Sequence, residues 1–255
     1  MTEAKPLVKK KNAIIQKTRS NMGEMEQKIW GYVCLVANNI PVEKIVPGQQ
    51  LTVKFRASDY YNYYDITDGG KNYENLEKTL SNMRDIKMQI KTDNDFTAFG
   101  FIDNVYVNKN GDCEITINRE MVPMITAINE RTKDYTKIEA YNWGKMNGKY
   151  AIKLHEYLLS RYDKQIGKID SRKKEQRKID PKPLDIVMTL ENLRLYFMVE
   201  RIKTYKEYKF FNSKIIKPAV KEINENSEIY VTYFGKGRPI DRVVFTVCRK
   251  RVIND

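Results

Sequence analysis

The chain has 255 residues, 41% of them hydrophobic, which is enough for one large domain or two small domains with buried cores. Its first residues are polar and basic, and no apolar run approaches the ~20 residues that cross a bilayer. We therefore expect no signal peptide, no membrane span and a cytoplasmic location. Lys and Arg number 46 against 33 Asp and Glu, and this net charge of +13 favours an anionic partner without deciding between nucleic acid and lipid.

The first predicted elements are an amphipathic helix, a short strand and two further helices. The opening helix is indicated by apolar residues at helical spacing: Met25, Ile29, Tyr32, Val33 and Val36. A strand is predicted over Leu51–Phe55, and Ser58 and Asn72 are predicted to cap the next two helices. In the last of these helices one face is apolar, with Tyr73, Leu76, Leu80 and Met83. The opposite, exposed face is predicted to hold Asn75, Lys78, Thr79 and Asn82.

Three strands are predicted next, because the sequence becomes rich in β-branched and aromatic residues over Lys87–Thr92, Ala98–Val107 and Cys113–Asn118. The tripeptide Asn110-Gly111-Asp112 predicts a hairpin turn between the last two strands. The following segment, 126–149, is predicted to be a helical connector.

The second half of the chain repeats this order of elements. A helix is predicted over Tyr150–Tyr162, then a basic loop, a strand over Leu184–Met188 and a helix capped by Thr189. A third helix is predicted over Tyr205–Asn226, followed by a hairpin with Glu228–Phe234 and Ile240–Cys248 flanking the turn 235–239. Three helices followed by a hairpin is the winged form of the helix-turn-helix. We therefore predict an α+β fold of two tandem winged-helix domains, 8–125 and 150–250, joined by the connector.

The positive charge is concentrated in four stretches. Residues 1–19, 161–178 and 236–251 each carry an excess of five basic side chains. Residues 201–221 carry seven basic side chains against one acidic side chain. The rest of the chain is slightly acidic. Positive charge concentrated in this way favours binding to a polyanion over a general role in solubility.

The third helix of the second half is the predicted recognition helix. Its apolar side holds Tyr208, Phe211, Ile215, Ala219 and Ile223. Its other side, with Lys209 at the edge, holds the predicted DNA contacts Lys206, Lys209, Phe210, Ser213, Lys214, Lys217 and Lys221. The alternative is an ordinary solvated lysine face. Pro218 lies inside this helix and crowds the carbonyl of Lys214, so a bend is predicted there.

Two further surfaces are candidates for DNA contact. The wing turn holds Lys236 and Arg238, with Arg242 on the returning strand, and these residues are predicted to grip the DNA backbone or the minor groove. In the first domain the exposed helix face is almost neutral. Its Asn75 and Asn82 could pair with adenine, and the same face could equally be ordinary polar surface or a dimer contact.

No catalytic, cofactor or metal site is predicted. The single histidine, His155, lies on an apolar helix face, which favours a core residue over a metal ligand. The 17 tyrosines are candidate nucleophiles, but no metal cluster accompanies them. The cysteines Cys34, Cys113 and Cys248 are far apart and odd in number, which favours reduced thiols.

Several segments resemble the Rep_3-type (RepB/RepE-like) initiator proteins of plasmids that carry repeated origin sites. The resemblance is strongest in the helix Lys149–Leu159 and in Phe211–Asn224, which reads FNSKIIKPAVKEIN. Ser227–Phe234 and Arg238–Val247 resemble the family's wing, and Asn21–Val36 its opening helix. The chain departs from the family pattern at His155, where an aromatic residue is common, and in its long basic loop 163–183.

The resemblance implies a replication initiator that binds direct repeats (iterons) in double-stranded origin DNA and opens an adjacent AT-rich region. It implies partners as well: a homodimer in equilibrium with the monomer, the host initiator and the replicative helicase. Dimers of such proteins often repress their own gene. The alternatives are a winged-helix transcriptional repressor without a replication role, and a tyrosine-based nickase, which would need a metal-dependent strand break.

Overall fold

The computed structural model describes residues 5–67, 69–91, 96–126, 134–172 and 182–250. The chain divides into two compact units, Met1–Lys145 (unit 1) and Met146–Asp255 (unit 2). Each unit is described by itself. In the described part of the chain, no helix is both long enough and apolar enough to cross a membrane.

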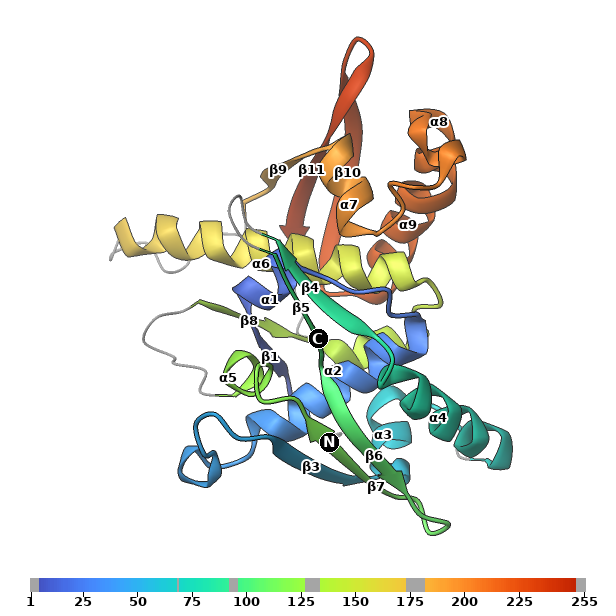
Figure 1. The fold of residues 1–255 in the computed structure, drawn as a ribbon. Helices are drawn as coiled ribbons and strands as arrows, with labels where there is room; N and C mark the ends of the chain where they lie inside the picture. The colour runs from blue at the N-terminus through green and yellow to red at the C-terminus, as the bar shows by residue number, and fades with distance from the viewer. Residues whose placement is uncertain (1–4, 68, 92–95, 127–133, 173–181, 251–255) are drawn as a thin grey trace, which may run out of the picture. The chain divides into compact units, whose positions relative to one another are not determined.

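Unit 1 is built around one helix, α2 (Glu24–Asn38), which is coloured blue in Figure 1. Most of the circumference of this helix is buried, because apolar residues lie outside the predicted stripe as well as on it. Gly31 allows a close approach to α2, since a Cβ there would lie 2.6 Å from the ring of Trp143 and 2.8 Å from the hydroxyl of Tyr64. That hydroxyl donates to the carbonyl of Lys28 at 2.7 Å.

Three small antiparallel sheets surround α2, in the strand orders β1-β8, β2-β4-β5 and β3-β7-β6. Their strands are β1 (Val8–Lys11), β2 (Thr18–Arg19), β3 (Leu51–Arg56), β4 (Lys87–Lys91), β5 (Phe96–Gly100), β6 (Ile102–Val107), β7 (Asp112–Ile117) and β8 (Tyr135–Ile138). The remaining helices of unit 1 are α1 (Asn12–Lys17), α3 (Ala57–Tyr64), α4 (Gly70–Met83) and α5 (Val122–Ile125), with 3-10 turns η1 (Val42–Lys44) and η2 (Ala140–Lys145).

The helices predicted in unit 1 are present, but both predicted N-caps are wrong. α3 begins one residue before Ser58, and the backbone N–H of Ala57 donates to the carbonyl of Gly111 at 2.8 Å. α4 begins at Gly70, and the side chain of Asn72 donates to the carbonyl of Thr67 at 2.5 Å. The first amide of α3 is thus satisfied by a remote carbonyl rather than by the polar side chain nearest in sequence.

The strand predicted over Ala98–Val107 is two strands in different sheets. β5 pairs with β4, whereas β6 pairs with β7 through the predicted hairpin, in which Gly111 has φ 80°. The break falls at Phe101, which is fully buried and packs edge-on against Trp30 at 4.8 Å between ring centroids. The chain therefore passes from one sheet to the next at a residue whose ring is held in the core.

The connector also differs from the prediction. Residues 127–133 lie outside the described residues, but β8 follows them and pairs in register with β1, Val8 opposite Ile138. In β8 the alternating side chains of Thr136 and Ile138 are buried, which is the pattern of a strand with one face in the core. The described part of 126–149 therefore contributes a strand and a 3-10 turn to the core of unit 1.

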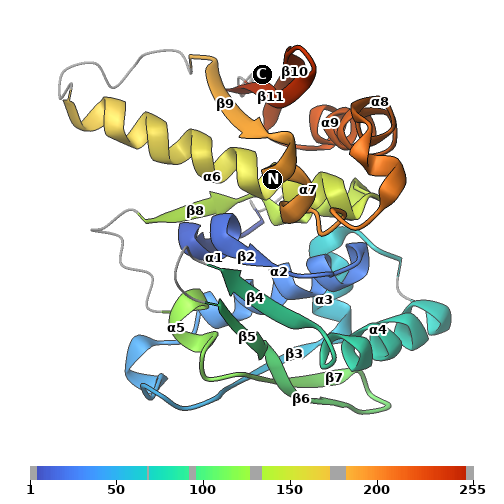
Figure 2. The same ribbon diagram turned by 45° about the horizontal axis from the view of Figure 1, so that its top comes forward.

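Unit 2 combines one long helix, a helix-turn-helix and a three-stranded sheet of order β10-β11-β9. Its helices are α6 (Lys149–Arg172), α7 (Leu190–Tyr196), α8 (Tyr208–Phe211) and α9 (Lys217–Asn226). The 3-10 turn η3 (Lys203–Lys206) precedes α8, and the strands are β9 (Leu184–Thr189), β10 (Ile229–Gly237) and β11 (Ile240–Arg249). α6 lies against the sheet (Figure 2), and the β10–β11 hairpin projects as a long ribbon with α8 beside it (Figure 1).

The elements of unit 2 follow the predictions in type and order, but several of their bounds differ. Thr189 caps α7 as predicted, because its hydroxyl accepts from the backbone N–H of Asn192 at 3.1 Å. α6 continues ten residues beyond the apolar stripe that ends at Tyr162, since no proline interrupts it. The disruption predicted at Pro218 takes the form of a π-helical turn, η4 (Asn212–Ile216), which joins α8 and α9 into one helical stretch. A wider turn directly before Pro218 accommodates its missing N–H and its ring.

Candidate nucleic-acid interface

The helical stretch Tyr208–Asn226, here called the recognition helix, buries one side and exposes the other. Its buried side holds Phe211, Ile215, Ile216, Ala219, Val220 and Ile223. Its exposed residues include Lys209, Phe210, Ser213, Lys214, Lys217 and Lys221, as predicted. Lys206 is exposed too, but it lies on η3 just before the helix rather than on it. The lysines are therefore neither hidden against protein nor scattered.

Most of these ammonium groups have no partner within the described residues. In the part of the chain that the structure describes, no ion pair or side-chain hydrogen bond engages Lys206, Lys209, Lys214 or Lys217, whereas Lys221 lies 3.8 Å from the carboxylate of Glu225. Unpaired, exposed lysines retain their full charge toward an external anion. The interface thus presents a strip of uncompensated positive charge on a rigid, apolar-backed helix.

The wing adds basic side chains beside this helix. Lys236, Arg238 and Arg242 are all exposed near the tip of the β10–β11 ribbon, where Arg238 and Pro239 form the turn through a cis peptide bond. Arg242 makes a two-pronged contact with Asp241, at 3.0 Å and 2.7 Å, and this hydrogen bonding lowers the pKa of Asp241. Arg242 is thus paired within the wing and Lys236 also acts on the Asp241 carboxylate, whereas Arg238 has no side-chain hydrogen bond or ion pair within the described residues.

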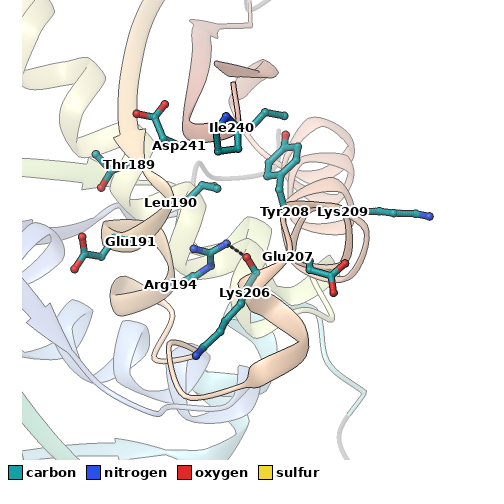
Figure 3. Close-up of a pocket in the computed structure, with 11 residues that line it drawn as sticks. Thr189, Leu190, Glu191, Arg194, Lys206, Glu207, Tyr208, Lys209, Ile240 and Asp241 are labelled. Carbon is teal, nitrogen blue, oxygen red and sulfur yellow. Dashed lines mark hydrogen bonds between the residues drawn. The ribbon is translucent and has the colours of Figure 1, made fainter. Parts of the chain in front are cut away.

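Arg194, a residue not singled out from the sequence, fixes the turn that leads into the recognition helix. Its guanidinium donates to the carbonyl oxygens of Tyr205 and Lys206, both at 2.8 Å, and lies 5.5 Å from the ring centroid of Phe211. Figure 3 shows Arg194 reaching across a groove of about 780 Å³ between α7 and the start of α8. The planar guanidinium can donate hydrogen bonds to two carbonyl oxygens at once, whereas an ammonium group lacks this fixed, planar arrangement of donors.

Two asparagines fix the wing to the recognition helix. The side-chain amide of Asn224 accepts from the backbone N–H of Val231 at 2.7 Å and donates to its carbonyl at 2.8 Å. Asn212, in the π-helical turn, accepts from the hydroxyl of Tyr233 at 2.8 Å. Asn224 belongs to the quoted segment Phe211–Asn224, yet its role depends on a strand that follows it in the chain. The helix and the ribbon are thereby presented as one rigid surface.

Unit 2 also contains a buried network of ionisable side chains, formed around His155 of α6 and Glu228 just before β10. His155 is fully buried, as predicted for a core histidine, and its Nε2 lies 3.0 Å from the carboxylate of Glu228. Arg249 contacts Asp163 at 3.0 Å beside this pair. Burial by itself raises the pKa of Glu228, but His155, hydrogen bonds and Arg249 lower the pKa to about 2. Within the described ranges, no group of three or more His, Cys, Asp or Glu residues is placed to hold a metal ion.

This network gives unit 2 a predictable sensitivity to acid. The pKa of Glu228 is about 2 in the folded chain against 4.5 for an ordinary Glu, so its stabilising effect is complete above about pH 4.5 and is lost as the pH falls toward 2. Asp163 opposes this in part, because burial raises its pKa. We expect the wild type to lose roughly 3 kcal/mol more of its unfolding free energy over this range than Glu228→Gln loses. Urea unfolding followed by circular dichroism at several pH values measures it.

A matched control for this acid effect is Glu225→Gln, because Glu225 is exposed on α9 and its carboxylate meets, among the described residues, only Lys221. Its pH profile should follow that of the wild type. Equal pH slopes for wild type and Glu228→Gln would show that the carboxylate is not stabilised by its buried partner.

In unit 1 the predicted contact face of α4 is only partly correct. Asn75, Lys78 and Asn82 are exposed, but Thr79 is buried, with 8% of its surface exposed, and donates to the carbonyl of Asn75 at 2.6 Å. Thr79 lies three residues after Leu76 and four before Met83, so the helix turns it toward the core with them. Thr79 therefore cannot contact a ligand on this face.

The helix-turn-helix followed by a projecting ribbon, with free lysines on the second helix, defines unit 2 as a winged-helix module of the kind that binds nucleic acid. Comparison with known proteins finds winged-helix matches in both halves of the chain. Residues 7–159 match the first winged-helix domain of the initiator replication proteins, and residues 189–247 match the second winged-helix domain. The chain belongs to the initiator replication protein family and has its two winged-helix domains.

Individual relatives are distant in sequence. The chain is 22% identical over 232 residues to a replication initiation protein of Escherichia coli, covering 90% of this chain but 66% of that relative's length. A crystal structure of the Pi initiator protein in complex with iteron DNA superposes with a TM-score of 0.69 at 14% identity, covering 97% of this chain and 98% of that chain. This second likeness shows that the fold is shared.

Proposed function

We propose that this chain is a plasmid replication initiator that binds direct repeats in double-stranded origin DNA, with the recognition helix of unit 2 in the major groove. The observation that carries the proposal is the set of four exposed, unpartnered lysines: Lys206, Lys209, Lys214 and Lys217. The major groove admits an α-helix, and lysines reach both phosphates and guanine edges from it. Family membership and the fold shared with an initiator that was crystallised on iteron DNA support the same conclusion.

The contacts divide by chemistry. Lys214, Lys217 and Lys221 supply charge to phosphates, while Phe210 and Ser213 lie among them and are suited to base edges, Phe210 toward a thymine methyl. Lys236 and Arg238 of the wing contact the adjacent backbone or minor groove. In unit 1, Asn75, Lys78 and Asn82 form a second, nearly neutral contact that adds base recognition with little dependence on salt.

The later steps of initiation follow from the family and form part of the proposal. Monomers bound to direct repeats open the adjacent AT-rich DNA and attract the host initiator and the replicative helicase. Dimers, in equilibrium with monomers, bind an inverted repeat and repress the chain's own gene. No catalytic step and no cofactor is assigned to the chain in this proposal.

The decisive experiment is footprinting of the chain on the DNA that flanks its gene, combined with a salt titration of affinity. We expect protection of direct repeats spaced by about two helical turns, beside an AT-rich tract. Each neutralised phosphate adds about 0.9 to the negative slope of log affinity against log salt, so a slope of several units is expected. A slope near zero would contradict the proposal.

Replication itself needs a separate readout. A plasmid that carries the flanking DNA and no other origin should be maintained only when the chain is supplied. Protection of an inverted repeat alone, together with failure of such a plasmid to replicate, would favour the transcriptional repressor. A nicked product from supercoiled origin DNA with Mg²⁺ or Mn²⁺ would instead favour the nickase.

A further inference from the structure

One acidic side chain lies within the basic surface of unit 2. Glu207 caps the recognition helix, because its backbone carbonyl accepts from the N–H of Phe211 at 3.1 Å. Its side chain is exposed and stands between Lys206 and Lys209 in sequence. Figure 3 shows the side chains of Glu207 and Lys209 pointing away from Arg194, outward from the helix start.

The other two carboxylates of the recognition helix have partners. Glu222 accepts from the backbone N–H groups of Asn147 and Gly148 at 2.7 Å and 3.0 Å, which caps α6, and Glu225 lies 3.8 Å from Lys221. Within the described residues the carboxylate of Glu207 has neither a hydrogen bond nor an ion pair. It is therefore an uncompensated negative charge at the start of a helix whose exposed lysines suit a polyanion.

Docking this surface on DNA would cost affinity unless Glu207 met a donor. The N-terminal residues of a recognition helix are the ones that approach base edges. The phosphates and most major-groove atoms are acceptors, which repel a carboxylate, and the donors are the amino groups of cytosine and adenine. In an A·T pair the adenine amino group is flanked by an acceptor on both sides, N7 of adenine and O4 of thymine, whereas in a C·G pair the cytosine amino group is flanked by the acceptor O6 of guanine on one side only and by the C5–H of cytosine on the other.

We propose that Glu207 is a specificity-determining residue that accepts a hydrogen bond from the N4 amino group of one cytosine in the bound duplex. This inference rests on the proposed function, because it requires the recognition helix to lie in the major groove. Glu207 then has two opposing effects. It weakens binding to every duplex through its charge, and it restores affinity only where a cytosine occupies the matching position.

The test is a binding selection with the full chain on duplexes that carry a randomised segment of about two helical turns. The wild type should enrich one cytosine position that Glu207→Ala no longer enriches. At fixed salt the variant should lose about tenfold in affinity for the selected sequence, as for one mismatched base pair, and gain affinity for random duplex. Glu207→Gln keeps the side-chain shape and should relax the cytosine preference in the same direction.

The matched control is Glu225→Ala, which removes one negative charge from the other end of the same helix. It should raise affinity for all duplexes alike and leave the enriched sequence unchanged. The inference is overturned if Glu207→Ala behaves in the same way, or if the position it affects selects a base other than cytosine. If the wild type itself enriches no sequence and shows no salt dependence, the proposed function fails instead.

Discussion

Replacing Lys214 and Lys217 together by alanine is expected to weaken binding to duplex DNA by roughly 50-fold at ~0.1 M salt. Both ammonium groups are exposed and have no partner in the described residues, so no internal ion pair compensates for their loss. Each phosphate contact contributes about 0.9 to the salt slope, and removing two should reduce that slope by roughly 2. A gel-shift titration at several salt concentrations measures both quantities.

The control for this double variant removes the same charge from elsewhere. Lys44 and Lys109 are exposed in unit 1, outside every predicted contact, and their double alanine variant should bind almost as the wild type does. The fold should survive the change of Lys214 and Lys217, because neither side chain is buried. An unchanged salt slope would mean that these lysines face solvent in the complex, which is the ordinary lysine face that composition alone left open.

Replacing Arg194 by methionine is expected to reduce specific DNA binding at least tenfold by a different route. Arg194 is half-buried, and its two hydrogen bonds hold the turn directly before the recognition helix. Hydrogen bonds to a charged group contribute about 1.5–3 kcal/mol each, so unit 2 should lose stability as well as affinity. Arg194→Lys should be nearly as damaging, since a single ammonium cannot span both carbonyls with the same geometry.

The salt slope separates this positioning role from a DNA contact. For Arg194→Met the slope should equal that of the wild type, because no phosphate partner is removed, while the urea midpoint should fall. A slope reduced by about 1 with an unchanged urea midpoint would assign Arg194 to phosphate binding and would contradict its positioning role. The Lys214/Lys217 double variant, measured in parallel, should show the opposite result: a reduced salt slope with an unchanged urea midpoint.

Much of the fold could be predicted because it follows from the spacing of apolar residues within each element. The apolar spacing of Met25 to Val36 and of Phe211 to Ile223 predicts which side of each helix is buried, and the structure confirms both helices. Asn110-Gly111 predicts its hairpin because glycine adopts a positive φ at little cost. The free lysines of the recognition helix follow from the same logic, since residues opposite an apolar stripe face water.

Other features could not be predicted because a remote residue decides them. Phe101 divides one predicted strand into two by packing on Trp30, and β8 forms in the presumed connector because β1 offers it a partner. Thr79 is a different case, because its position was predictable: the sequence analysis placed it outside, although Leu76 and Met83 at i−3 and i+4 of the same helix set it beside the core.

The sequence by itself determined that this chain has two winged-helix modules and which helix presents its lysines, because periodic burial and charge are local properties. Only the tertiary structure decided how that surface is held. The hydrogen bonds of Arg194 to two carbonyls and of the Asn224 amide to Val231 join groups that meet only after folding. Folding likewise decided that the carboxylate of Glu207 has no partner among the described residues. A hydrogen bond requires two atoms within about 3 Å, and sequence spacing fixes such distances only within a single element.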